Sequence, residues 1–149
     1  MSGTVRTISQ LLAQFASGQP AQSIDPADEQ DFIATMNDLT SAKITPTIQT
    51  GTGSPPTYTF VLADASRCVL MNNAAANNLV VPPNSSVPFV VGQLLPFWQL
   101  GAGITTLVAG AGVTLLPGPG VTLAMRGQRT FGTIYQYTAN TWLVSGDFT

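Results

Sequence analysis

The sequence predicts a mainly β fold: a small antiparallel β-sandwich or barrel preceded by a short two-helix N-terminal segment. Three observations support this prediction. Charged residues make up 8% of the 149-residue chain and hydrophobic residues 44%, whereas ordinary soluble proteins have about 25% charged residues. Gly and Pro occur 14 and 11 times without forming a repeat. From residue 58 onward, apolar and polar residues alternate with the period of two that is typical of strands.

The first 40 residues carry the spacing of two short helices, which we interpret as a helical attachment segment, residues 1–40. Apolar residues at positions 8, 11, 12 and 15 share one helical stripe. A second helix begins with Asp25 as N-cap and Pro26 at the first helical position. Helices this short are marginal alone, so their apolar faces need another surface. The side chains that we expect to dock on a partner are Leu11, Leu12, Phe15, Phe32 and Ile33.

Residues 41–57 are rich in Thr, Gly, Ser and Pro, which predicts a linker or extended arm before an oligomerising antiparallel β-domain, residues 58–149. Pairs of glycines at 101/103, 110/112 and 118/120 indicate the turns of a β-meander. The expected strands are Tyr58–Ala63, Cys68–Met71, Leu79–Val81, Val87–Val91, Leu94–Leu100, Ile104–Val108, Val113–Leu116, Val121–Met125, Phe131–Tyr137 and Trp142–Ser145.

A stretch of 58 residues, Cys68 to Met125, contains no Asp, Glu, Lys, Arg or His. Acid–base catalysis, metal binding and nucleophile activation mostly need titratable groups held close together. We therefore expect no enzyme, no cofactor and no metal site. The glycine pairs run into Val/Thr strand patterns and lack the third glycine and following helix of a dinucleotide fingerprint, so we interpret them as turn glycines.

Composition also limits the partners that we expect. The five basic residues are scattered singly, which predicts no nucleic-acid binding. Asn, Pro and Gly interrupt every apolar run before it reaches the roughly 20 residues of a membrane-spanning helix, so we expect no membrane insertion. The single cysteine, Cys68, has apolar neighbours and is interpreted as a small buried hydrophobe.

The β-domain has more apolar strand residues than one small core can accommodate. Contiguous apolar patches on a soluble monomer rarely exceed a few hundred Å², so we expect some of these residues to meet other chains. The predicted oligomer interface comprises Phe89, Leu95, Phe97 and Trp98.

Residues 58–149 resemble the small β-domains of tailed-bacteriophage virion proteins: head fibres, capsid decoration or cement proteins, and some tail-fibre components. The motifs that carry the resemblance are YTFVLADASRCVLMNNAAANNLVVPPNSSVPFVVGQLLPFWQLGAG, then VAGAGVTL and the terminal WLVSGD. The opening ISQLLAQF and SIDPADEQDFIATMND are similar to the helical pieces by which such proteins attach to a virion. The resemblance implies a non-enzymatic structural subunit on the virion exterior, often a homotrimer, bound to the major capsid protein or another virion protein.

Two alternatives remain open at the level of sequence. One is a tail adaptor or short tail-fibre component, because the resemblance covers head and tail proteins alike. The other is a glycan-binding module for host attachment, in which aromatic side chains would stack on sugars. The candidates for that stacking are Trp98, Tyr135, Tyr137 and Trp142.

Overall fold

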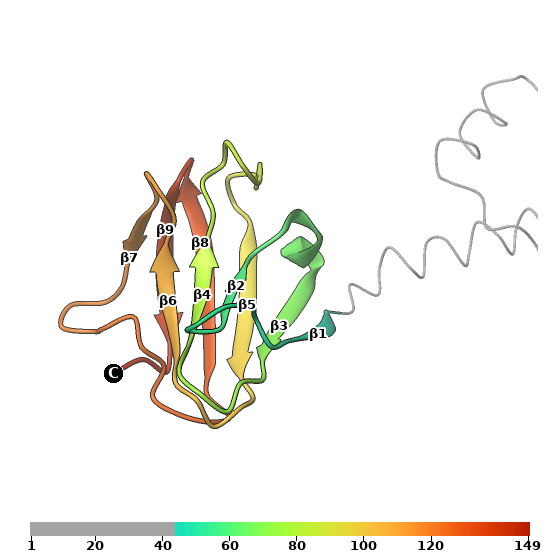
Figure 1. Ribbon diagram of the computed structural model, residues 1–149. Coiled ribbons are helices and arrows are strands. Elements are labelled where there is room, and N and C mark those ends of the chain that lie inside the picture. The colour runs from blue at the N-terminus through green and yellow to red at the C-terminus, as the bar shows by residue number, and fades with distance from the viewer. Residues whose placement is uncertain (1–43) are drawn as a thin grey trace, which may run out of the picture. The chain divides into compact units, whose positions relative to one another are not determined.

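The computed structural model describes residues 44–149, which form two β-sheets and one short helix (Figure 1). The six-stranded sheet contains, in order across it, β1 (Thr45–Gln49), β3 (Arg67–Met71), β5 (Leu94–Gln99), β8 (Phe131–Thr138), β9 (Thr141–Gly146) and β7 (Thr114–Leu116). The three-stranded sheet contains β2 (Thr57–Thr59), β4 (Asn77–Val81) and β6 (Thr105–Ala109), and the 3₁₀ helix η2 spans Leu62–Ser66. The prediction of a mainly β fold is confirmed for these residues. The predicted helices of residues 1–40 lie outside the described residues.

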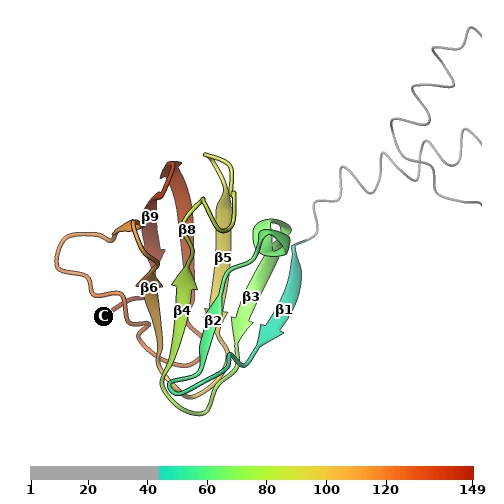
Figure 2. The ribbon, with the colours of Figure 1, turned by 45° about the horizontal axis from the view of Figure 1, so that its top comes forward.

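From β1 to β6 the chain alternates between the two sheets. β1, β3 and β5 are parallel neighbours in the larger sheet, and β2, β4 and β6 are parallel neighbours in the smaller one. The chain thus makes three successive coils, residues 45–59, 67–81 and 94–109, each giving one strand to each sheet (Figure 2). The predicted antiparallel arrangement is therefore wrong for these coils. Antiparallel pairing occurs where β8 joins β5 and β9 joins β8, and β7 adds to β9 in parallel.

The β-domain begins before residue 58. The sequence predicts a linker or extended arm over 41–57, whereas Thr45 to Gln49 pair with Arg67 to Met71 as the edge strand β1. β2 likewise begins at Thr57, inside the predicted linker. Thr and Ile favour strands, and a Pro is tolerated in a strand at the edge of a sheet. The turn-rich composition therefore describes only the connection between β1 and β2.

Two predicted strands are absent from the described residues. The segment 87–91 is irregular, and Gln93 N donates to Val90 O at 2.9 Å in a turn that follows it. The segment 121–125 pairs only at single positions, where Ala124 bridges to Thr106 and Met125 to Phe148. In both segments apolar side chains lie in the core or on the surface, and the backbone forms no continuous ladder of hydrogen bonds with a neighbouring strand.

The hydrophobic core lies between the two sheets. Alternate residues of β3, β4, β5, β6, β8 and β9 point into it, and Trp142, Phe97 and Ile134 are fully buried. The complete set of buried apolar side chains is Phe60, Val69, Met71, Leu79, Val81, Phe89, Leu95, Phe97, Leu107, Met125, Ile134, Trp142, Val144 and Phe148. Aromatic rings meet edge to face inside it, with centroids 5.6 Å apart for Phe89 and Trp142. This arrangement is the one that aromatic pairs prefer.

The turn between β5 and β6 stacks directly on the turn between β3 and β4. Gly103 N donates to Asn73 O at 2.9 Å, and Gly101 N donates to Met71 O at 3.0 Å. A Cβ on Gly101 or Gly103 would overlap the backbone of Asn73 or Ala75. These glycines are turn glycines, as predicted, but they are required by close contact between coils rather than by a hairpin of a meander.

Buried amides close the same end of the coils. Asn77 Oδ1 accepts from Thr105 Oγ1 at 2.9 Å, and Asn77 Nδ2 donates to Gly103 O at 3.2 Å. Gln99 Oε1 accepts from Thr105 N at 3.0 Å. Because buried polar groups are costly unless they are hydrogen-bonded, these bonds allow polar residues to lie in the interior and link the second coil to the third.

Candidate functional site

Strand β5 shows which of the predicted interface residues are available to a partner. Leu95 and Phe97 point into the core and are fully buried, while Leu94 and Trp98 point to the opposite side and are exposed. Phe89 is also buried, against Trp142. The predicted interface is therefore wrong for Phe89, Leu95 and Phe97, because the single chain buries them itself. Trp98 alone of the four lies on the surface.

The surface around Trp98 is the side of the six-stranded sheet that faces away from the core, which we call the outer face. One row of side chains crosses four strands, from Ile48 on β1 through Leu70 and Trp98 to Phe131 on β8. Trp98 is 41% exposed and packs against Phe131, with ring centroids 5.2 Å apart. This row is continuous because each residue is the pairing partner of the next.

A second row crosses the other end of the outer face. Leu94 pairs with Tyr135, Tyr135 with Leu143, and Leu143 with Leu116. All four side chains are exposed, by 41–49%. Between the two rows lie small or uncharged side chains: Pro46, Cys68, Pro96, Thr133 and Ser145. The outer face thus consists of two apolar rows with an uncharged strip between them.

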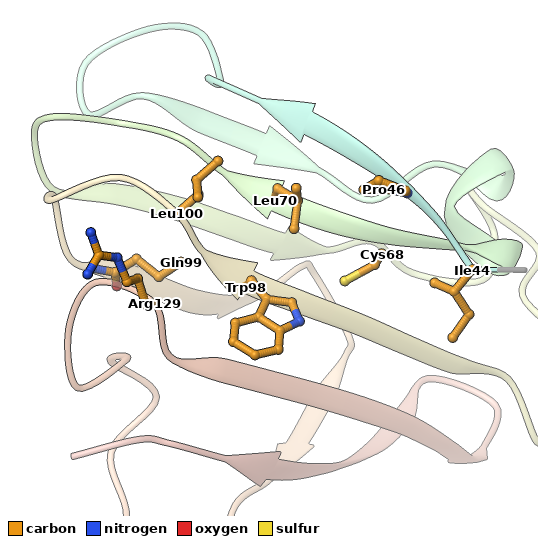
Figure 3. A pocket seen from close by; sticks show the side chains of 8 residues that line it. All are labelled: Ile44, Pro46, Cys68, Leu70, Trp98, Gln99, Leu100 and Arg129. Atoms are coloured by element: carbon orange, nitrogen blue, oxygen red, sulfur yellow. The ribbon is translucent and has the colours of Figure 1, made fainter.

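A shallow groove of about 420 Å³ lies on the outer face over β1, β3 and β5 (Figure 3). Its lining is Ile44, Pro46, Cys68, Leu70, Trp98, Gln99, Leu100 and Arg129. Arg129, at the end of the groove near Leu100, is its one charged residue. Arg129 has a φ of 68° and its backbone N donates to Gln99 O at 2.7 Å. A left-handed conformation is uncommon for Arg. The hydrogen bond to Gln99 O holds the start of the segment leading to β8 against the end of β5.

Cys68 lies in the strip between the rows, and its thiol is half-buried. Burial raises the pKa of the Cys68 thiol, which lowers the fraction of reactive thiolate at neutral pH. The predicted small hydrophobe in a strand is confirmed as to the strand, β3, but its side chain belongs to the outer face and not to the core.

Titratable groups meet at Asp64 and Tyr58. Asp64 is buried, and its Oδ2 accepts from Tyr58 Oη at 3.0 Å and from Val61 N at 2.9 Å. Burial, together with the charge and hydrogen bond of Asp64, raises the pKa of Tyr58 to about 12. The contact with Tyr58 joins η2 to β2 and the contact with Val61 N caps the start of η2, so we interpret the pair as structural. Within residues 44–149, no group of three or more His, Cys, Asp or Glu side chains could hold a metal ion.

The structure separates the aromatic residues proposed for glycan stacking. Trp142 is fully buried in the core, whereas Trp98, Tyr135 and Tyr137 are exposed. Trp98 and Tyr135 lie in different rows of the outer face. The predicted docking residues Leu11, Leu12, Phe15, Phe32 and Ile33 lie outside the described residues.

Most of the outer face is not apparent from the sequence. The predicted linker over 41–57 includes Ile48, and Leu70 lies in a strand whose two sides are both apolar. Tyr135 is predicted for glycan stacking rather than for association, and Leu143 lies between Thr141 and Ser145 on its side of β9. The predicted turn glycines Gly101 and Gly103 do lie in a turn. Their spacing does not indicate that the strands on either side of this turn pair in parallel with the strands of the preceding coil. The signal for the outer face is the alternation along β5. Leu95, Phe97 and Gln99 share one buried side, so Leu94 and Trp98 share the other.

No protein-family model matches this chain, and a search of curated proteins also finds no match. In the described part of the chain, the structure contains no helix with the length and hydropathy needed to cross a bilayer.

Proposed function

We propose that this chain is a non-enzymatic structural protein of a bacteriophage virion: a capsid decoration, cement or head-fibre protein that docks on the major capsid lattice and oligomerises through its β-domain. The observation that carries the proposal is the largely apolar outer face of the six-stranded sheet, because such patches mark sites of association. The resemblance of residues 58–149 to virion β-domains supports the same class of protein. A subunit that binds only the assembled shell stabilises it by mass action.

Docking through the N-terminal segment can be tested by co-sedimentation with empty capsids of the parent phage. The double change Leu12→Asp with Phe15→Asp places two charges in the predicted apolar stripe and is expected to lower capsid affinity at least tenfold. Gln14→Asp, in the same predicted helix but outside the stripe, is the matched control and should retain affinity. Unchanged binding of the double variant would contradict the assigned attachment site.

A tail location is the second candidate, since the resemblance also covers tail-fibre components. Co-sedimentation with isolated tails rather than capsids distinguishes it. Glycan binding is favoured by one observation, the exposure of Trp98, Tyr135 and Tyr137. Binding to a glycan array that is lost on Tyr137→Ala, with the assembly state intact, would establish that function in place of a purely structural one.

A further inference from the structure

We propose that copies of this chain associate by packing their outer faces together, through the apolar rows of Ile48, Leu70, Trp98 and Phe131 and of Leu94, Tyr135, Leu143 and Leu116. The proposal identifies the surface used for the self-association that the proposed function includes, and to that extent it rests on that function. The occupant of the outer face is the same face of another copy.

The chemistry of the outer face selects an uncharged partner. Residues 44–149 contain five charged side chains, and two of them lie at the border of the outer face: Arg129, at the end of the groove, and Asp147, whose Oδ2 accepts from Phe131 N at 3.3 Å. Asp64, within η2, is buried, and the guanidinium of Arg126 lies 3.4 Å from Phe148 O. Only Arg129 reaches the groove, at its end. Over the two apolar rows, a charged partner surface would lose its hydration without gaining ion pairs, whereas a second outer face is apolar in the same places.

The size of the outer face suits an interface. Six of the exposed apolar side chains in its two rows are Ile48, Leu94, Trp98, Leu116, Tyr135 and Leu143, each 41–61% exposed. With about 150–250 Å² for a whole aromatic side chain, these six offer on the order of 500 Å². That is more than half of the about 800 Å² that each partner gives to a standard interface. The half-buried strip between the rows supplies further contact area.

The outer face also has features of an interaction centre. Trp and Tyr are enriched among the residues that dominate binding energy, and here Trp98 and Tyr135 stand on β5 and β8, the central strands of the sheet. Trp98 is held in place by Phe131, 5.2 Å away between ring centroids, so its position is already ordered before association. By contrast, Val80 and Val108, the apolar side chains on the corresponding face of the three-stranded sheet, are half-buried.

The test is sedimentation equilibrium of the full-length chain. The double variant Leu94→Lys with Tyr135→Lys places charges on exposed positions of one row and is expected to weaken self-association at least tenfold. Val121→Lys, an exposed apolar position outside the sheets, is the matched control and should associate like the wild type. A wild type that is monomeric at all concentrations, or a double variant that associates normally, would overturn the proposal.

Thiol labelling gives a second readout that needs no variant. Cys68 is the single cysteine of the chain and lies between the apolar rows, so its rate of maleimide modification reports on this face alone. The rate is expected to fall at least tenfold as the protein associates. A rate independent of association would place the interface elsewhere and overturn the proposal, even if the double variant failed to fold.

Capsid co-sedimentation of the same proteins separates the two proposals. Self-association that depends on Leu94 and Tyr135 without any capsid binding supports the interface and refutes the docking function. A monomeric wild type whose double variant loses capsid binding would assign the outer face to another virion protein and overturn self-association.

Discussion

At the scale of single residues, Tyr58 and Asp64 show how a chain with few charges uses one of them. The Asp64 carboxylate accepts hydrogen bonds from Tyr58 Oη and Val61 N, at 3.0 and 2.9 Å. A buried carboxylate is stable only when its oxygens have such partners. The first bond joins β2 to η2 and the second caps the start of η2, where the chain passes from the smaller sheet to the larger one.

This contact predicts a loss of stability at high pH. The pKa of Tyr58 is raised from 10.0 to about 12 in the folded protein, so the folded state holds the phenol proton more tightly than the unfolded state. The contribution to stability is complete below pH 10 and is lost as the pH rises towards 12. Urea unfolding of the wild type and Tyr58→Phe from pH 9 to 12 measures it: the difference in unfolding free energy should shift in favour of Tyr58→Phe above pH 10. A constant difference would contradict the prediction.

Phe97 and Trp98 are adjacent residues whose truncation should cost different amounts of stability. Phe97→Ala should lower the free energy of unfolding by about 3–5 kcal/mol, the usual cost of truncating a buried Phe. Trp98→Ala should cost about 1 kcal/mol, the value of an aromatic pair such as that with Phe131. Denaturant unfolding at concentrations where the chain is dissociated checks both values. Equal losses would contradict the assignment of Trp98 to the outer face.

At the scale of elements, the turn at Gly101 and Gly103 determines how the third coil lies on the second. Both glycines contact the backbone of Asn73 or Ala75 in the preceding turn, and neither has the positive φ of Gly112 or Gly120. Space, and not backbone conformation, is therefore what excludes a side chain from these two positions.

Gly103→Ala should therefore be strongly destabilising. The added methyl group would overlap the backbone of Ala75, and relieving such an overlap costs about 3 kcal/mol. Gly127→Ala is the matched control, because an added Cβ meets nothing within 4 Å there and no positive φ strains it. It should change the free energy of unfolding by no more than about 1 kcal/mol. Thermal or urea unfolding of both variants distinguishes a packing effect from a general cost of replacing glycine.

The predicted strands match the structure where they pair with a neighbouring strand, and they fail where apolar residues are buried without such pairing. The predicted strands at 68–71, 94–100 and 131–137 match β3, β5 and β8 closely. The segments 87–91 and 121–125 have similar apolar content but lie in irregular connections. Apolar side chains of these segments pack into the core, where Phe89 and Met125 are both buried. A short apolar segment that is buried without strand pairing therefore has the same sequence pattern as a strand.

At the scale of the whole molecule, the larger sheet of the described residues combines the parallel strands of the three coils with the antiparallel β8–β9 hairpin. The hairpin extends the larger sheet beyond β5, which gives the outer face its width. A chain that lacked β8 and β9 would present only the row from Ile48 to Trp98. The wide, largely apolar face is thus a product of the combined topology.

Self-association through this face should be insensitive to salt. Salt screens ion pairs, and the apolar rows contain no charged side chain. Raising NaCl from about 0.05 M to about 1 M is expected to leave the dissociation constant unchanged or lower it. Light scattering across a dilution series measures this. A tenfold weakening would show that ion pairs hold the copies together, with Arg129 the nearest cation to test by Arg129→Gln.

The sequence by itself determined the mainly β class, most strand positions and the surplus of apolar strand residues, because alternation and composition are local properties. Only the tertiary structure decided that the coils pair in parallel, that β1 belongs to the domain, and that Leu95 and Phe97 are buried while Leu94 and Trp98 are exposed. Parallel and antiparallel strands share the same period of two. When both sides of a strand are apolar, only its neighbours in space decide which side is covered.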